Sequence, residues 1–403
     1  MELFWLEHKK LWRKKIVKIC VLLCFVYYVI FGSILSFQWF CFGSSDDYTS
    51  AFGNNFDGYT VIKDSQEYAL SFGGELTDET LQKIVSDYQQ MEADGMEEEL
   101  EKTDWQIVNS WLGTLYPELR DTGNYKTMIS YVDPDKLTGF YERRQQVLDE
   151  FLEVSGQVGA EKEFLHQIER KVEKPFRYEW VEGWSTLLGS MVADLGVVMA
   201  LFLGIVLSSL FAGEWHDNTS TLVLTTRNGW GKIALAKILT GLAFTVELFA
   251  LLAVSIVISQ LFFMGTAGWD MPIQNIKLIA VAPMNMLQAE IYEYAFVLLG
   301  AIGFAGIVMF ISAAVKNNVL TLLLSLAVVY GPMMIAEYLP YGMQKALDLI
   351  PLVGSSTDIF RTNTFRILGK LIWSPYLLIT IPVLIGILCM PFAIKSWSRR
   401  MKA

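Results

Sequence analysis

Six long apolar runs constrain most strongly what this chain can fold into. Each holds about 20 or more residues, which is the length that an α-helix rising about 1.5 Å per residue needs to cross the hydrocarbon core of a bilayer. The composition agrees, because 53% of the 403 residues are hydrophobic and only 18% are charged. The sequence therefore predicts an α-helical polytopic membrane protein with six transmembrane helices. The runs cover residues 16–38, 185–212, 233–264, 291–315, 318–337 and 373–394.

The first run is predicted to be an uncleaved transmembrane helix, because its apolar core exceeds the roughly 7–15 residues of the apolar region of a signal peptide. Residues 1–15 precede it and mix aromatic and aliphatic side chains with Lys9, Lys10 and Arg13. This mixture predicts an N-terminal helix that lies in the membrane interface. The alternative is a plain basic flank of the first span.

Basic residues indicate the orientation, because cytoplasmic flanks retain Lys and Arg. They concentrate at both chain ends, after the second run and in the turn after the fourth. This pattern predicts a multi-pass protein of the cell membrane with cytoplasmic N- and C-termini. Four residues between runs five and six break the pattern, since the same topology places them outside: Lys345, Arg361, Arg366 and Lys370.

Residues 40–183 form an acidic segment that separates the first two runs. This segment has 30 Asp and Glu against 13 Lys and Arg, and it is long enough to bury a core of its own. Residues 59–74 predict one or two short strands, and the helical spacing from Leu76 to Met91 predicts a helix capped by Thr77 or Asp78. We therefore expect a large, mostly helical α+β extracellular domain between transmembrane helices 1 and 2. The acid run at 92–104 lacks calcium-loop spacing and is expected to be a solvated face.

The segment 211–239 gathers polar residues between runs two and three, but it does not match known enzyme motifs. RNGWGKI does not fit a phosphate-binding loop, because Thr226 stands where the first glycine is required. The three histidines, His8, His166 and His216, are too far apart for a zinc-protease motif, and no GxSxG occurs. We therefore expect no catalytic site, no metal site and no bound cofactor on this chain, and no nucleic-acid partner.

Two acids inside predicted spans are candidates for a substrate path, because charge in hydrocarbon is costly and usually faces a partner or a cavity. Glu247 lies midway along the third run, and Asp194 lies early in the second. The alternative for each is a hydrogen-bonded structural carboxyl. Another pattern, Gly300, Gly303 and Gly306 in the fourth run, predicts close packing against another helix.

The segment 211–239 also shows a residue order that resembles a known family. Glu214 is followed by Asn218-Thr219 or Ser220-Thr221, by the apolar run 222–224, by Arg227 and by Lys237. This order is similar to the cytoplasmic connection in membrane subunits of ATP-binding-cassette exporters of the ABC-2 type. The usual glycine before Thr is missing, but Asn218 adopts a left-handed backbone more readily than Ser220, so a sharp turn is expected there.

The resemblance implies a permease subunit of a bacterial exporter. Residues 211–239 would then couple to a separate cytoplasmic ATPase subunit that binds ATP and Mg, while a second permease subunit, identical or not, completes the path within the membrane lipid. Glu214, Asn218, Thr219, Arg227 and Lys237 are the expected coupling residues. Glu214 would orient the segment, and Arg227 would pair with acids of the partner or with lipid phosphate. The alternatives are an ordinary positive loop and, for the whole protein, a membrane receptor or sensor that binds a ligand through its extracellular domain.

Overall fold

The protein is a mostly helical membrane protein in which five described helices are long and apolar enough to cross a bilayer. A computed structural model describes residues 2–41, 66, 73–95, 105–121, 126–188, 192–225, 231–354 and 363–399. The five helices coincide with the last five predicted runs. They are α11 (Val192–His216), α13 (Lys232–Phe263), α14 (Met286–Val315), α15 (Asn318–Ile335) and α17 (Ser374–Arg399).

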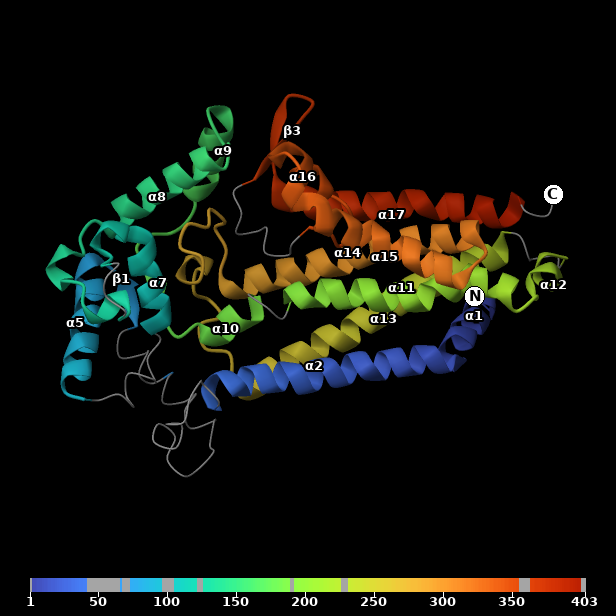
Figure 1. Cartoon of the computed structure of the whole chain (residues 1–403), viewed down its shortest axis with the longest axis horizontal. Helices are drawn as coiled ribbons and strands as arrows, with labels where there is room; N and C mark the ends of the chain where they lie inside the picture. The colour runs from blue at the N-terminus through green and yellow to red at the C-terminus, as the bar shows by residue number, and fades with distance from the viewer. Residues whose placement is uncertain are drawn as a thin grey trace.

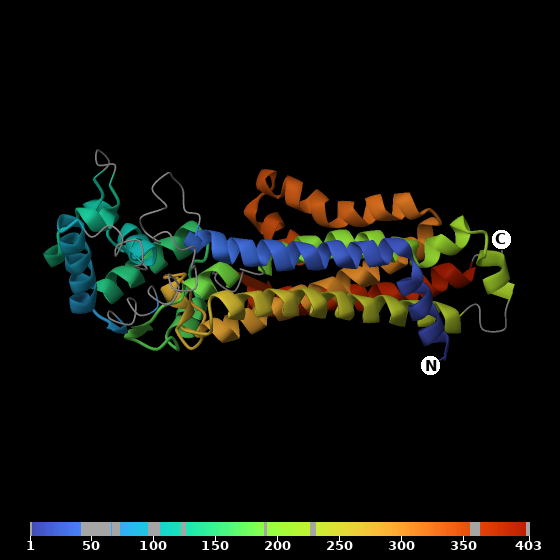
Figure 2. The ribbon, with the colours of Figure 1, turned by 90° about the horizontal axis from the view of Figure 1, so that it is seen from below.

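Residues 2–41 form two helices, with a bend at Lys14 between them. α1 (Glu2–Arg13) crosses the end of the bundle, and α2 (Lys15–Cys41) runs beside α13 along most of its length (Figures 1 and 2). The division agrees with the predicted boundary between an N-terminal helix at 1–15 and an apolar helix from 16 onward.

α14 is the central helix of the bundle and packs against α11, α13, α15 and α17. Glycines make its contact with α17 close. A Cβ at Gly303 would lie 2.3 Å from the carbonyl oxygen of Pro382, and one at Gly306 would lie 2.4 Å from that of Gly386. The predicted close packing along this glycine series is confirmed.

The acidic segment forms a separate helical layer at one end of the bundle, while both chain termini lie at the other end (Figures 1 and 2). Within its described part, two short strands, β1 (Gly74–Leu76) and β2 (Phe176–Tyr178), pair antiparallel and so join residues that are about 100 positions apart. The predicted cap is confirmed, because the Thr77 side chain accepts a hydrogen bond from the Thr80 amide at the start of α5. The four main helices are α5 (Asp78–Ala93), α7 (Trp105–Leu115), α8 (Phe140–Val154) and α9 (Ala160–Glu169).

Two predictions for this layer fall mainly outside the described residues. The strands expected at 59–74 and the acid run at 92–104 overlap the described part only at residues 66, 73–74 and 92–95.

Arg144 fastens the acidic layer to the bundle. This fully buried side chain donates hydrogen bonds to the Leu278 and Ala280 carbonyls at 2.7 and 3.1 Å, in the connection between α13 and α14. It also donates to Glu169 at 2.6 Å, and Lys174 lies 2.8 Å from the same carboxylate oxygen. Burial opposes ionisation of Glu169, but the hydrogen bonds from Lys174 and Arg144 outweigh it and hold its pKa below the ordinary value. The connection also contains a short turn, η5 (Ile273–Asn275).

The second span begins later than expected. α11 starts at Val192, whereas the apolar run begins at 185, because residues Glu182–Thr186 form a short separate helix, α10. Tertiary contacts hold α10 in place: Gln260 donates to the Gly183 carbonyl at 2.6 Å, and Trp184 donates to the Ala267 carbonyl at 2.7 Å.

The connection between α15 and α17 carries the basic residues that break the charge pattern. Arg366 pairs with Glu161 of α9 at 2.7 Å, and this bond holds the pKa of Glu161 below its usual value. The Lys345 ammonium donates to the Thr364 carbonyl. Acidic and carbonyl groups on this side of the bundle therefore attract the two cations, while Arg361 lies outside the described residues. The elements of this connection are η6 (Ala336–Tyr338), α16 (Tyr341–Leu347) and a hairpin of β3 (Thr364–Ile367) and β4 (Lys370–Trp373).

Candidate coupling site

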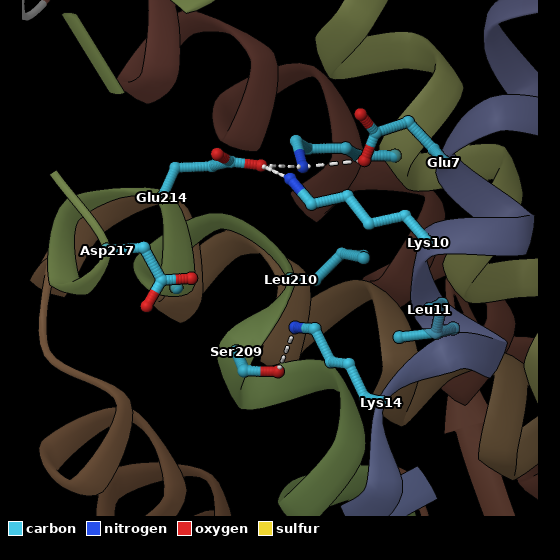
Figure 3. Close-up of a pocket in the computed structure, with 10 residues that line it drawn as sticks. Glu7, Lys10, Leu11, Lys14, Ser209, Leu210, Glu214 and Asp217 are labelled. Carbon is cyan, nitrogen blue, oxygen red and sulfur yellow. Dashed lines mark hydrogen bonds and ion pairs between the residues drawn. The ribbon is translucent and has the colours of Figure 1, made fainter. Parts of the chain in front are cut away.

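A buried charge cluster lies where α1 meets the ends of α11 and α13. The Glu214 carboxylate, only 3% exposed, accepts hydrogen bonds from Lys10 at 2.5 Å and from Lys237 at 2.8 Å. Lys237 also pairs with Glu7 at 2.7 Å, and the Thr219 hydroxyl donates to Glu214. We call these five residues the Glu214 cluster. Figure 3 shows the Lys10 side chain extending from α1 to Glu214, with Glu7 on the same side of the cluster and Lys14 extending to Ser209 instead.

The local sequence explains why Glu214 and Thr219 meet. α11 ends at His216, and Asn218 then adopts a left-handed backbone with φ of 57°. Asn tolerates this conformation better than most residues with a side chain. The turn brings the Thr219 amide to within 2.9 Å of the Glu214 carbonyl, just before α12 (Ser220–Thr225) begins. The predicted turn at Asn218 is confirmed.

Lys10 of α1 and Lys14, which directly follows α1, experience opposite effects. Partial burial disfavours the charge of Lys10, but its bond to Glu214 outweighs burial and holds its pKa above the ordinary value. Burial lowers the pKa of Lys14, as do the nearby charges of Lys237 and Lys10, and its ammonium donates to Ser209 at 2.9 Å. α1 and the bend that follows it are thus joined to α11 at two levels.

The cluster has the geometry of a structural joint. The hollow beside it is only about 20 Å³, which is room for about one water molecule. Lys237 is 1% exposed, and removing one partner of such a buried ion pair typically costs about 3–5 kcal/mol. The small hollow and the buried ion pairs of the Glu214 cluster therefore favour a role in holding the helices together over a role in binding a substrate.

Four of the five expected coupling residues come together here. Glu214, Thr219 and Lys237 are bonded to one another, and Asn218 makes the turn between the first two. Arg227 lies outside the described residues.

The two expected path residues lie apart from each other and from the cluster. Glu247 accepts a hydrogen bond from the Trp12 indole at 3.0 Å and lies 3.2 Å from the His8 ring, so its partners belong to α1. Asp194 is exposed near the start of α11, 20 positions before Glu214, or about 30 Å at 1.5 Å per residue. For Glu247 the geometry favours the hydrogen-bonded structural carboxyl that the sequence left open.

Sequence reasoning missed the contribution of α1 and two acids of α14. The residue types of the segment 1–15 predict a basic interfacial helix, and they give Glu7 and Lys10 no partner in the bundle. Glu290 and Glu293 are 6% and 0% exposed, and within the described part of the chain neither carboxyl oxygen of Glu293 has a hydrogen-bond partner. Their spacing of three residues at the start of an apolar run was the available signal, because it places both on one helix face.

Comparison with known proteins adds no relative: no protein-family model, curated protein or solved structure matches this chain. The fold therefore defines the class, an α-helical membrane protein, and its function has to be argued from the site.

Proposed function

We propose that this chain is the membrane subunit of an ATP-binding-cassette exporter of the ABC-2 type. In this proposal α2 is the first of six spans, the acidic layer is an extracellular domain, and both termini are cytoplasmic. The observation that carries the proposal is the Glu214 cluster, because it joins two spans, the segment between them and the N-terminal helix at the end of the bundle that holds both termini.

The joint suits the transmission of a rigid-body movement. A force on α12 reaches α11 through the bond between Thr219 and Glu214, and it reaches α13 through the bond between Glu214 and Lys237. Buried charge pairs resist sliding, because separating them leaves a charge without a partner in a dry environment. Closure of a separate ATPase subunit on ATP and Mg would therefore shift both spans together.

The test is capture of the ATPase. The full chain is purified with an affinity tag from its native membrane, and we expect a cytoplasmic ATPase subunit to co-purify. Arg227→Glu is expected to reduce the amount retained or its ATP turnover. Lys395→Glu is the matched control, since it makes the same charge change on an exposed residue of α17 at the same end of the bundle. Absence of an ATPase, or equal retention together with equal ATP turnover in both variants, contradicts the proposal.

The substrate path is proposed to lie between two permease subunits in the membrane lipid. The assignment of Glu247 and Asp194 to this path stays a prediction. Glu247→Gln is expected to change transport by the assembled complex without changing its assembly. Unchanged transport would assign Glu247 to the contact with α1 alone.

A second function, that of a receptor or sensor, is favoured by one observation. A polar hollow of about 350 Å³ lies between the acidic layer and the connection from α13 to α14, with Arg177, Asp270 and Gln274 in its wall. Hollows of this size accept small molecules. A purified complex that holds no ATPase, but in which Arg177→Ala weakens binding of an external ligand, would favour this function over transport.

A further inference from the structure

The hairpin of β3 and β4 has an anchored base and a bare apolar tip. At the base, the Thr364 hydroxyl donates to Gln157 at 2.7 Å, and Trp373 is 3% exposed. Toward the tip the side chains are increasingly exposed, with Ile367 at 40% and Leu368 at 99% exposure. The base is therefore held by the rest of the molecule, whereas the tip projects from it.

The residue at the turn is unexpected for a hairpin in water. Leu368 and Gly369 are the two central residues, and both have positive φ, at 50° and 80°. Two-residue hairpin turns with this backbone prefer Asn, Asp or Gly at the first position, and a bulky side chain there is strained. Leu368 combines this strain with full exposure of an apolar side chain, and an apolar environment around the tip would offset the cost of that exposure.

A bilayer is the environment that the position of the hairpin favours. β4 ends at Trp373, and α17, a candidate span, begins at Ser374, so the hairpin starts at the membrane boundary. Figure 1 shows the hairpin extending sideways from the bundle at the end of α17 nearer the acidic layer, across the long axis of the helices. With the helices crossing a bilayer, this direction runs along its surface.

The charges beside the tip are those that lipid phosphates attract. Lys370 is exposed and has no ion pair among the described residues, and the Arg366 side chain is 58% exposed beside its bond to Glu161. Basic residues flanking exposed apolar ones are typical of segments that lie in the interface of a membrane. Nearby Tyr338 and Tyr376, at 85% and 61% exposure, are of the kind enriched at that depth.

We propose that the tip of this hairpin, residues 367–370, inserts into the headgroup layer of the leaflet on the side of the acidic domain. Leu368 reaches the upper acyl chains, and Lys370 binds lipid phosphate. The inference rests on the transmembrane arrangement under the proposed function and is independent of the ATPase partner. It also gives Lys370, one of the cations that break the charge pattern of the sequence, a ligand on the outer surface.

The test measures how close the tip lies to lipid. The full chain, with Cys20, Cys24, Cys41 and Cys389 replaced by Ala, receives Leu368→Cys or, as a control, Val154→Cys. Val154 is 89% exposed at the end of α8 in the acidic domain. Each introduced cysteine carries an environment-sensitive fluorophore in nanodiscs of phosphatidylcholine with a minority of phosphatidylglycerol, and part of the phosphatidylcholine is brominated on its upper acyl chain.

We expect quenching at position 368 to exceed that at 154 by about two-fold or more, and Lys370→Glu to reduce it only when phosphatidylglycerol is present. Equal quenching at the two positions overturns the proposal. So does a fluorophore at 368 that is shielded in detergent, if the unlabelled Leu368→Cys variant also forms a disulfide between two molecules at this position under oxidation, because the occupant is then a second copy of the chain. Labelling of the Val154→Cys variant by an impermeant maleimide on intact cells tests separately whether the acidic layer lies outside the cell. A wrong transmembrane topology is thereby distinguished from a hairpin that stays in water.

Discussion

The coupling energy between Glu214 and Lys237 is the most direct measure of the joint. Both side chains are nearly inaccessible, at 3% and 2%, and their charged atoms are 2.8 Å apart. Glu214→Leu leaves Lys237 buried with Glu7 as its remaining acid, 2.7 Å away. Losing one partner of a buried pair costs about 3–5 kcal/mol. Because Glu7 keeps part of the attraction, we expect a loss near the lower end, about 3 kcal/mol.

A double-mutant cycle separates this pair from general packing. Glu214→Leu combined with Lys237→Met replaces both charges by apolar groups, and such replacements are often neutral. The loss in the free energy of unfolding of the double variant is therefore expected to be smaller than the sum of the losses of the two single variants, by at least about 2 kcal/mol. Lys10→Met is the control, because Lys10 is half exposed and its loss is expected to cost less than about 1 kcal/mol.

The assay is denaturant titration of the full chain in mixed micelles, followed by tryptophan fluorescence. Single changes whose effects simply add would refute the reasoning, since the two charges would then contribute independently. A Glu214→Leu cost as small as that of the Lys10→Met control would refute it as well.

Three further outcomes are expected from the structure. Gly306→Ala should lower the thermal unfolding temperature, because its Cβ would lie 2.4 Å from the Gly386 carbonyl, whereas Gly331→Ala meets open space and should be nearly neutral; equal shifts would contradict the close contact. The pKa of Glu169 is lowered in the fold, so its contribution to stability is complete above the unfolded value of 4.5 and disappears as the pH falls below it. The denaturant midpoint of Glu169→Gln should therefore drop less than that of the parent between pH 6 and about pH 3.5, and parallel curves would count against this role. Glu293→Gln should keep or raise the unfolding temperature, because the buried carboxyl has no hydrogen-bond partner in the described part of the chain, and a large loss would reveal one.

Local patterns of the sequence predicted much of the fold. The apolar runs predicted the helices of the bundle because their length is set by the hydrocarbon core and needs no tertiary information. The cap at Thr77 and the turn at Asn218 were predictable for a similar reason, since both depend on the backbone preferences of single residues.

The partners of the charged residues were not predictable in this way. Lys10 and Glu214 are 204 positions apart, and Arg144 lies 134 positions from Leu278. No periodicity relates such residues, because only the packing of whole helices decides which side chains meet. Glu247 illustrates the point: its place midway along an apolar run indicated a path, yet α1 folds back across α13 and supplies its hydrogen bonds.

The sequence by itself determined that this chain is a helical membrane protein with an acidic, mostly helical segment inserted near its start. Hydrophobic length and net charge are additive along a chain, so they can be counted without knowing the fold. The tertiary structure alone decided that Glu214 is the centre of a buried joint and that Leu368 stands bare at the tip of a hairpin. Burial and pairing belong to the arrangement of several elements, and they appear only when those elements are brought together.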